Sequence, residues 1–137
     1  MSMQKKLPRR VEKPWGYELW WAHTPRYVGK VIFVKQGHRL SLQYHEKKDE
    51  TMYVYSGKAR LELGDEGSNL AATVLEAGQA LHLPPLTRHR VEALEDTTLL
   101  EVSTPEVEDV VRLSDDYGRA RDTAALRQRR GNSTMNR

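Results

Sequence analysis

The stretch RLSLQYHEKKDE, residues 39–50, alternates polar and apolar side chains and then runs into a charged turn. Because successive side chains of a β-strand point to opposite faces, this alternation predicts a strand with one wholly polar face. The polar face carries Arg39, Ser41, Gln43 and His45. The opposite face carries Leu40, Leu42 and Tyr44. The polar face lies either against solvent or in a polar interior, and an interior position would require partners for these groups inside the protein.

Short strand-like runs recur along the chain up to residue 120. They are rich in β-branched and aromatic residues, and Gly, Pro, Asp and Asn separate them. The runs are YELWWA, YVGKVIFVK, RLSLQYH, TMYVYSG, KARLELG, LAATVLEAG, QALHLPP, HRVEAL, TTLLEVSTP and VEDVVRL. Since none of this sequence shows the helical period of about 3.6 residues, the runs predict an all-β antiparallel sandwich or barrel. Within it, RLELGDEGSNLAATVLEAG predicts a hairpin with the loop GDEGSN.

The positive charge of the chain is concentrated at its two ends. With 137 residues, the chain is long enough for one domain with a sizeable core. The formal net charge is +3, and residues 1–13 and 121–137 each carry +4, so residues 14–120 carry −5. We therefore predict a flexible basic N-terminal arm over 1–13, one domain over 14–120 and a disordered basic tail over 121–137. Because the aromatic residues lie in the acidic body, away from these charges, no nucleic-acid partner is expected.

Several kinds of site and location are excluded or disfavoured by the composition. The chain has no cysteine, which excludes disulfides and thiolate metal sites. No apolar run approaches the ~18 residues that a membrane-spanning helix needs, so no membrane partner is expected. The N-terminal sequence MSMQKKLPRR has the charges of a secretory signal but no apolar segment behind them. We therefore expect a cytoplasmic protein.

Ligand-type side chains lie at the ends of three of the predicted strands. The sequence HLPPLTRHRVE places His89 at the start of a strand, after a Pro-Pro turn, and Glu50 opens the strand TMYVYSG. If both strands neighbour SLQYH with their inner faces aligned, four ligands meet: Gln43, His45, Glu50 and His89. Two imidazoles, a carboxylate and an amide oxygen suit Zn, Mn, Fe, Co or Ni better than Cu(I) or Ca. We expect one divalent metal ion as cofactor, with Zn or Mn favoured.

Two segments resemble the sequence motifs of the cupin superfamily. GHRLSLQYHEKKDETMYVYSG resembles the first motif through Gly37, Gln43, Tyr44, His45, Glu50 and Gly57. GQALHLPPLTRH resembles the second motif through Gly78, Pro84 and His89. The sequence departs from the motifs where Gln43 replaces the usual first histidine, and where Leu86 and Ala93 replace a glycine and an asparagine. The resemblance implies a cupin domain, a double-stranded β-helix or jelly-roll barrel, over 14–120.

The glutamine narrows the resemblance to one family. PWGYE, GHRLSLQYH and DDYGR look like the cupin domain of the type II mannose-6-phosphate isomerase/mannose-1-phosphate guanylyltransferase family, in which Gln-x-His replaces His-x-His. The likeness covers roughly 14–119 and implies a metal-dependent aldose–ketose isomerase, most simply of mannose 6-phosphate and fructose 6-phosphate. The guanylyltransferase activity is not implied, because no Gly-rich nucleotide loop is present. The family's His-Trp after the ligand glutamate is Thr51-Met52 here.

The isomerase interpretation assigns roles to further polar residues. Moving a proton between C1 and C2 of a sugar requires a positioned proton-transfer group. Lys48 precedes Glu50 with the Lys-x-Glu spacing of type I mannose-6-phosphate isomerases, and we predict that it is catalytic, with burial or the cation lowering its pKa. Arg119, in the DDYGR match, is the second predicted catalytic residue and a candidate phosphate ligand. The predicted substrate-binding residues are Arg39, Ser41 and Arg88.

Two other functions remain open at this stage. One is a non-catalytic carbohydrate-binding or regulatory cupin that retains its metal, which Thr51-Met52 favours. The other is a metal-dependent cupin dioxygenase, which Gln43 fits less well than a histidine would. The expected partner is a small phosphorylated sugar, and a homodimer is expected through PWGYELWW. The remaining histidines (His23, His38 and His82) are expected to be structural or exposed, and Tyr53 and Tyr55 to pack outside the barrel.

Overall fold

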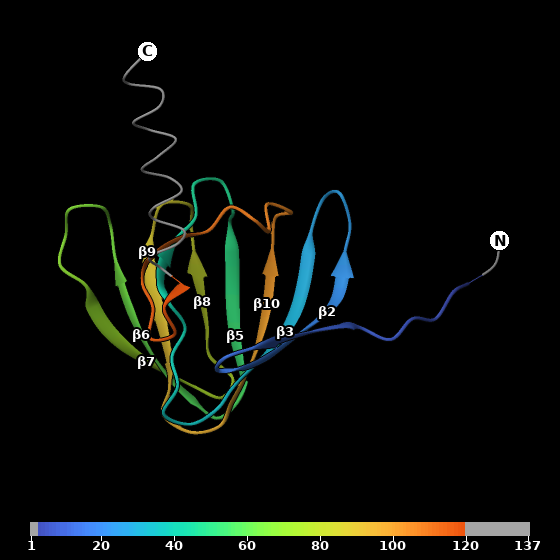
Figure 1. The fold of residues 1–137 in the computed structure, drawn as a ribbon, viewed down its shortest axis with the longest axis horizontal. Coiled ribbons are helices and arrows are strands. Elements are labelled where there is room, and N and C mark those ends of the chain that lie inside the picture. Colours follow the sequence, from blue (N-terminus) through green and yellow to red (C-terminus); the bar gives the residue numbers. More distant parts are fainter. Residues whose placement is uncertain (1–2, 120–137) are drawn as a thin grey trace, which may run out of the picture.

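The computed structural model describes residues 3–119, which form eleven β-strands in two antiparallel sheets (Figure 1). The six-stranded sheet has the order β1 (Arg9–Lys13), β2 (Gly16–His23), β3 (Val28–Val34), β10 (Thr97–Ser103), β5 (Glu50–Ser56), β8 (Ala80–Leu83). The five-stranded sheet has the order β11 (Val111–Ser114), β4 (Leu42–Tyr44), β9 (Arg88–Ala93), β6 (Lys58–Gly64), β7 (Ala71–Glu76). The all-β prediction is confirmed. The predicted tail over 121–137 lies outside the described residues.

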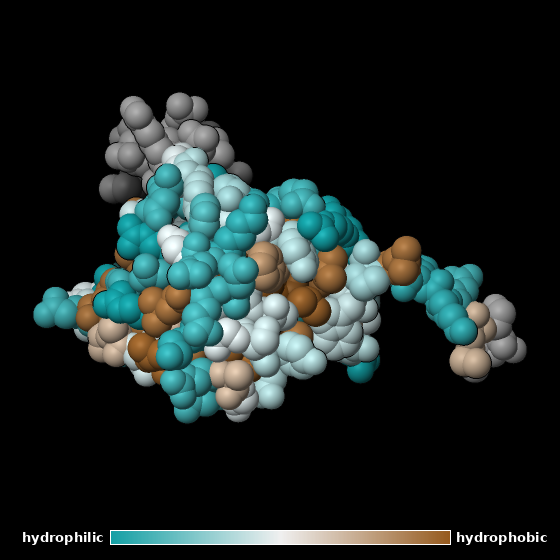
Figure 2. All heavy atoms as spheres, turned by 90° about the horizontal axis from the view of Figure 1, so that it is seen from below, coloured by the Kyte–Doolittle hydropathy of each residue, from teal (hydrophilic) through white to brown (hydrophobic). Residues whose placement is uncertain are grey.

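Strand β1 lies inside the region predicted as a flexible basic arm, 1–13. It pairs with β2 along its whole length, and its arginines pack on aromatic rings of that strand. The guanidinium carbon of Arg9 lies 5.3 Å from the ring centroid of Trp20, and that of Arg10 lies 3.9 Å from the centroid of Tyr17. Cation–π contacts of this kind stabilise a basic side chain against the sheet. The described barrel therefore includes β1, and only the residues before it extend away from the body (Figures 1 and 2).

The inner faces of the two sheets share one hydrophobic core. Among its best-buried members are Val54 on β5, Leu61 on β6 and Leu99 on β10, each at most 1% exposed. Figure 2 shows only small, scattered hydrophobic patches on the face that it presents. Tyr53 and Tyr55 alternate away from this core and are exposed, as predicted. No helix among the described residues has the length and apolar character required to span a membrane.

The chain passes from one sheet to the other at a tight turn between β5 and β6. Gly57 occupies this turn with φ +94°. A Cβ at this position would lie 2.4 Å from the backbone oxygen of Asp96 and 2.6 Å from the hydroxyl of Thr97. Only glycine fits both this backbone conformation and this close approach. The predicted hairpin follows directly, with β6 and β7 paired from Lys58↔Glu76 to Leu63↔Ala71.

The polar stretch that begins at residue 39 is less regular than its alternation predicts. Regular strand β4 starts only at Leu42, and Arg39 forms an isolated bridge with Glu92. Consequently the side chain of Leu40 turns into the core, where it is 8% exposed, and that of Arg39 turns outwards. The polar interior is confirmed for Ser41 and for the side chains that follow it on the inner face, but the predicted faces of residues 39 and 40 are wrong.

Candidate metal centre

Strand pairing brings the four predicted metal ligands together. Gln43 on β4 is directly paired with His89 on β9, and Glu50 begins β5 on the facing sheet. The ligand atoms of His45, Glu50 and His89 all lie within 4.8 Å of one another, and all three residues are buried. The Nε2 atom of His89 is 3.2 Å from Oε1 of Glu50, and Nε2 of His45 is 3.8 Å from Oε2. The barrel therefore concentrates two imidazoles and one carboxylate at a single point.

Both imidazole rings are held in the tautomer that binds metal. The Nδ1–H of His45 donates to the backbone carbonyl of Asp109 (2.8 Å), and the Nδ1–H of His89 donates to that of Thr87 (2.9 Å). A carbonyl oxygen can only accept, so each Nδ1 carries a proton, and in the neutral ring each Nε2 presents a lone pair to the centre. Burial lowers the pKa of His45 to about 4, which keeps its ring neutral at physiological pH.

The centre contains buried polar atoms that the described residues leave unsatisfied. Nε2 of His45 and both carboxylate oxygens of Glu50 have no hydrogen-bond partner in this part of the chain. Lys48 Nζ lies at ion-pair distance from Glu50 Oε2 (2.8 Å). Burial raises the pKa of Glu50, but His89 and Lys48 outweigh this effect and hold that pKa well below its usual range. Because unsatisfied buried polar atoms are rare in proteins, these residues fit a divalent cation.

Gln43 reaches the centre in a different orientation from the one predicted. Its Oε1 accepts a hydrogen bond from the hydroxyl of Ser41 (2.7 Å), and its Nε2 lies 3.4 Å from Nε2 of His89. A half-turn of the amide about its last bond would present the oxygen to the metal instead. Ser41 is 1% exposed and lines the same cavity as Gln43 and His45. Its hydroxyl contributes to the site by orienting the amide of Gln43.

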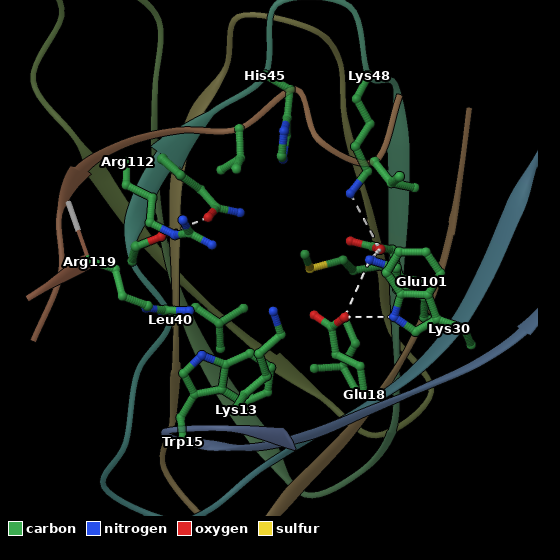
Figure 3. A pocket seen from close by; sticks show the side chains of 17 residues that line it. Lys13, Trp15, Glu18, Lys30, Leu40, His45, Lys48, Glu101, Arg112 and Arg119 are labelled. Carbon is green, nitrogen blue, oxygen red and sulfur yellow. Dashed lines mark hydrogen bonds and ion pairs between the residues drawn. The ribbon is translucent and has the colours of Figure 1, made fainter. Parts of the chain in front are cut away.

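A chain of buried charges of alternating sign leads away from the centre across the six-stranded sheet. Lys48 Nζ lies between Oε2 of Glu50 (2.8 Å) and Oε2 of Glu101 (3.5 Å). Lys30 Nζ lies between Glu101 (4.0 Å) and Glu18 (3.4 Å). Figure 3 shows Lys48, Glu101, Lys30 and Glu18 along one wall of the cavity. Each residue is at most 8% exposed, so the charges neutralise one another in a region that water barely reaches.

The electrostatics of this chain contradict one expectation from the sequence. Burial lowers the pKa of Lys48, but the carboxylates of Glu101 and Glu50 outweigh this effect, so the pKa is raised. The prediction of a lowered pKa is therefore wrong for the protein without a bound cation. Burial, together with the negative charge of Glu50, raises the pKa of Glu101 to about 8. The carboxyl of Glu101 is therefore protonated in an appreciable fraction of molecules near neutral pH.

Three residues of this chain were not identified from the sequence: Glu18, Lys30 and Glu101. Each lies in a strand of otherwise apolar character, at an inward-facing position. The sequence does contain a sign of them. Each of the runs YELWWA, YVGKVIFVK and TTLLEVSTP has a charged residue at one of the alternate positions whose side chains face the interior. The pairing of Glu101 with Lys30 could not be predicted from local sequence, because it joins two strands that are far apart in the chain.

Positive side chains line the cavity wall opposite Lys48 and Glu101. The cavity has a volume of about 110 Å³ and is bordered by His45 and Gln43. Figure 3 shows Arg112 and Arg119 on the opposite side and Lys13 at its edge, and all three line the cavity. Arg119, predicted from DDYGR, is thus at the site, where its guanidinium also pairs with the carboxylate of Asp115 (3.0 Å). Lys13 and Arg112 were not identified from the sequence.

The two other predicted substrate-binding arginines lie away from this cavity. Arg39 forms a two-pronged ion pair with Asp116, with Nε–Oδ2 at 2.7 Å. Arg88 donates to the backbone carbonyls of Asp65 and Ser68 and so fastens the loop between β6 and β7. The structure brings neither arginine to the metal ligands.

The chain resembles a described family and several known proteins. A family model described as "Mannose-6-phosphate isomerase C-terminal" matches residues 2–115. Xanthan biosynthesis protein XanB of Xanthomonas campestris is 34% identical over 116 residues, which is 81% of this chain and 24% of that protein. Mannose-1-phosphate guanylyltransferase ManC of Salmonella typhimurium is 34% identical over 118 residues, or 82% of this chain and 24% of that protein. The chain therefore spans about a quarter of the length of these curated relatives.

A solved structure shares the fold. KdgF from Halomonas sp. superposes with a TM-score of 0.64 and 27% sequence identity. The match covers 74% of this chain and 91% of KdgF. The predicted cupin jelly roll is confirmed by this likeness together with the two-sheet topology.

Proposed function

Because the chain belongs to the mannose-6-phosphate isomerase C-terminal family of cupin domains, we propose that it is a metal-dependent isomerase of a phosphorylated hexose. The simplest reaction is the interconversion of mannose 6-phosphate and fructose 6-phosphate. The names of its relatives support a mannose phosphate as the substrate. The observation that carries the proposal is the buried convergence of His45, Glu50 and His89 within 4.8 Å, next to Lys48.

The proton-transfer group Lys48 lines the same cavity as His45 and Gln43, and it lies 2.8 Å from the third ligand, Glu50. A divalent ion held by His45, Glu50 and His89, with Gln43 beside them, would supply Lewis acidity to the sugar oxygens on C1 and C2. The side chains of the protein exclude bulk water from this point, since all three ligands are buried. Their exclusion of water strengthens every charge interaction with the substrate.

Lys48 and Glu101 supply a route for the proton that moves between C1 and C2. Lys48 Nζ carries a proton and lies 3.5 Å from Oε2 of Glu101. In molecules in which Glu101 is ionised, its carboxylate can accept this proton. The transfer leaves a neutral Lys48 amine, which can take the proton from one carbon and return it to the other. The pKa of about 8 suits Glu101 for holding that proton near neutral pH. In this scheme Lys48 is the catalytic residue, and Glu101 sets its protonation state.

The test is exchange of the C2 proton of mannose 6-phosphate with solvent deuterium, followed by NMR. Metal-replete protein is expected to exchange this proton and to form fructose 6-phosphate. Lys48→Met is expected to lower turnover on the order of 10²–10⁴-fold with unchanged metal content. Lys47→Met is the matched control, because Lys47 is exposed and makes only a backbone contact with Asp109. Absence of exchange by the metal-replete protein would refute the isomerase.

An oxygenase is a second candidate because of the ligand set itself. The three groups within 4.8 Å form a set of two histidines and one carboxylate, which non-haem iron oxygenases also use. The amide oxygen of Gln43 is turned towards Ser41, which leaves this three-residue set intact. Consumption of a sugar substrate that requires O₂ would favour this candidate over the isomerase.

A further inference from the structure

Three basic side chains from different elements meet at the cavity beside the metal ligands. Lys13 ends β1, Arg112 lies on β11, and Arg119 follows that strand. Each lines the cavity that His45 and Gln43 border. Figure 3 shows Arg112 and Arg119 across from Lys48 and Glu101, and Lys13 at the edge between the two sides. We name Lys13, Arg112 and Arg119 the cationic wall.

The strand register fixes how close this wall lies to the metal ligands. Arg112 is directly paired with Gln43, and Gln43 is directly paired with His89. Residues opposite each other on neighbouring strands share a face, and neighbouring strands lie about 4.8 Å apart. Arg112 is therefore one strand from Gln43 and two from His89, on the same inner face. A ligand of the size of a hexose phosphate can contact both groups at once.

The positive charge of the cationic wall exceeds the negative charge paired with it. Among residues 3–119, Lys13 makes no ion pair, and the buried Nε of Arg112 has no hydrogen-bond partner. Asp115 is bound to Arg119, and Glu18, which also lines the cavity, is paired with Lys30, so the three cations and Asp115 leave a local charge of about +2. Burial lowers the pKa of both Lys13 and Arg112. The carboxylate of Glu18 raises both pKa values, but burial and the neighbouring arginine charges outweigh it. Partly buried positive charge that exceeds the negative charge paired with it favours the binding of an anion here.

The charge and the guanidinium groups of the cationic wall suit a phosphate monoester better than a carboxylate. A phosphate monoester carries about −1.5 to −2 at pH 7, which balances the wall, whereas a carboxylate would leave it positive. Guanidinium groups bind phosphate oxygens through paired hydrogen bonds. We propose that the cationic wall is the phosphate subsite of the substrate. The assignment of the bound molecule as a sugar phosphate rests on the proposed function. The phosphate then lies at the far end of the sugar from C1 and C2.

The test measures binding without metal and without turnover. Mannose 6-phosphate, inorganic phosphate and mannose are titrated separately into chelator-treated protein and followed by calorimetry. We expect both phosphates to bind and mannose not to bind. Arg112→Gln and Lys13→Gln are each expected to weaken mannose 6-phosphate binding on the order of 10- to 100-fold. Arg112→Lys, which keeps the charge but loses the paired hydrogen bonds, is expected to fall between Arg112→Gln and the wild type.

Arg88→Gln is the matched control, because Arg88 begins β9, in the same sheet as Arg112, and its side chain binds the loop between β6 and β7 outside the cavity. It should bind mannose 6-phosphate as the wild type does. Wild-type affinity in folded Arg112→Gln and Lys13→Gln would overturn the subsite, as would equal binding of mannose and its phosphate.

These outcomes are distinct from failure of the isomerase proposal. If the phosphates bind through the cationic wall and no C2 exchange occurs, the subsite stands and the isomerase is refuted. If C2 exchange proceeds equally well with mannose, or equally well in Arg112→Gln, the isomerase stands and the subsite is refuted. When both proposals hold, Arg112→Gln should raise KM more than it lowers kcat.

Discussion

Replacing Lys48 by methionine should strongly destabilise the metal-free protein. The Lys48 ammonium lies 2.8 Å from one carboxylate and 3.5 Å from another, and the three side chains are at most 6% exposed. At an effective dielectric constant of about 20, each attraction amounts to about 5 kcal/mol before the cost of removing the charges from water. Removing one member of a buried pair typically costs about 3–5 kcal/mol, because the partner charge remains buried. We expect Lys48→Met to lose stability in this range.

A double-mutant cycle with Glu101 separates the electrostatic effect from loss of packing. Glu101→Gln removes one of the two carboxylates that Lys48 neutralises. The double variant Lys48→Met/Glu101→Gln should therefore be more stable than the sum of the single effects predicts, by on the order of 1–3 kcal/mol. Urea denaturation with a chelator present, followed by circular dichroism, measures all four proteins at pH 9, where Glu101, with a pKa of about 8, is ionised. Lys47→Met, the exposed neighbour, should change stability by less than about 0.5 kcal/mol.

Two results would refute this reasoning. A loss below about 1 kcal/mol in Lys48→Met would show that the buried charges do not depend on one another. Additivity of the two single variants within about 0.3 kcal/mol would show that Lys48 and Glu101 are not coupled. A saturating divalent ion should reduce the loss in Lys48→Met, because the ion restores positive charge next to Glu50.

Further predictions concern pH and the turn between β5 and β6. Because the folded pKa of Glu101, about 8, lies above its ordinary value of 4.5, its stabilising effect is complete below pH 4.5 and is lost as the pH rises through 8. His45, with a folded pKa of about 4 against an ordinary value of 6.5, stabilises above pH 6.5 and loses this effect as the pH falls through 4. Metal-free protein should lose about 2 kcal/mol between pH 6.5 and 8 in urea titrations, and Glu101→Gln should abolish this loss. Gly57→Ala should lower the melting temperature more than Gly78→Ala. Both glycines have positive φ, but only at Gly57 would an added Cβ collide with a backbone oxygen. Equal losses in the two variants would show that this collision does not determine the effect.

The convergence of His45, Glu50 and His89 could be predicted from the sequence because each residue lies in a short motif with fixed spacing. His45 and Glu50 flank one turn, and His89 follows a Pro-Pro turn, so their convergence requires only that the strands align. The hairpin from β6 to β7 was equally local, since its loop carries its own turn residues.

What the sequence did not predict depends on contacts between distant segments. Leu40 faces the core because the chain is irregular before Leu42, where only the bridge from Arg39 to Glu92 joins the neighbouring strand. Strand β1 was predicted as part of a flexible arm because its residues are mostly basic, whereas its arginines pack on aromatic rings of β2. Likewise, Arg112 becomes a site residue only through its pairing with Gln43 on a strand far away in sequence.

The most direct test of the account is metal binding by the purified protein. Elemental analysis after equilibrium dialysis against Mn²⁺ or Zn²⁺ should find about one ion per chain in the wild type. His82→Ala should retain the ion, because His82 is exposed and paired with Asp49. The double variant His45→Ala/His89→Ala should bind none. A stoichiometric ion retained in that folded double variant, or no ion bound by the wild type, would contradict the metal centre on which the proposed chemistry depends.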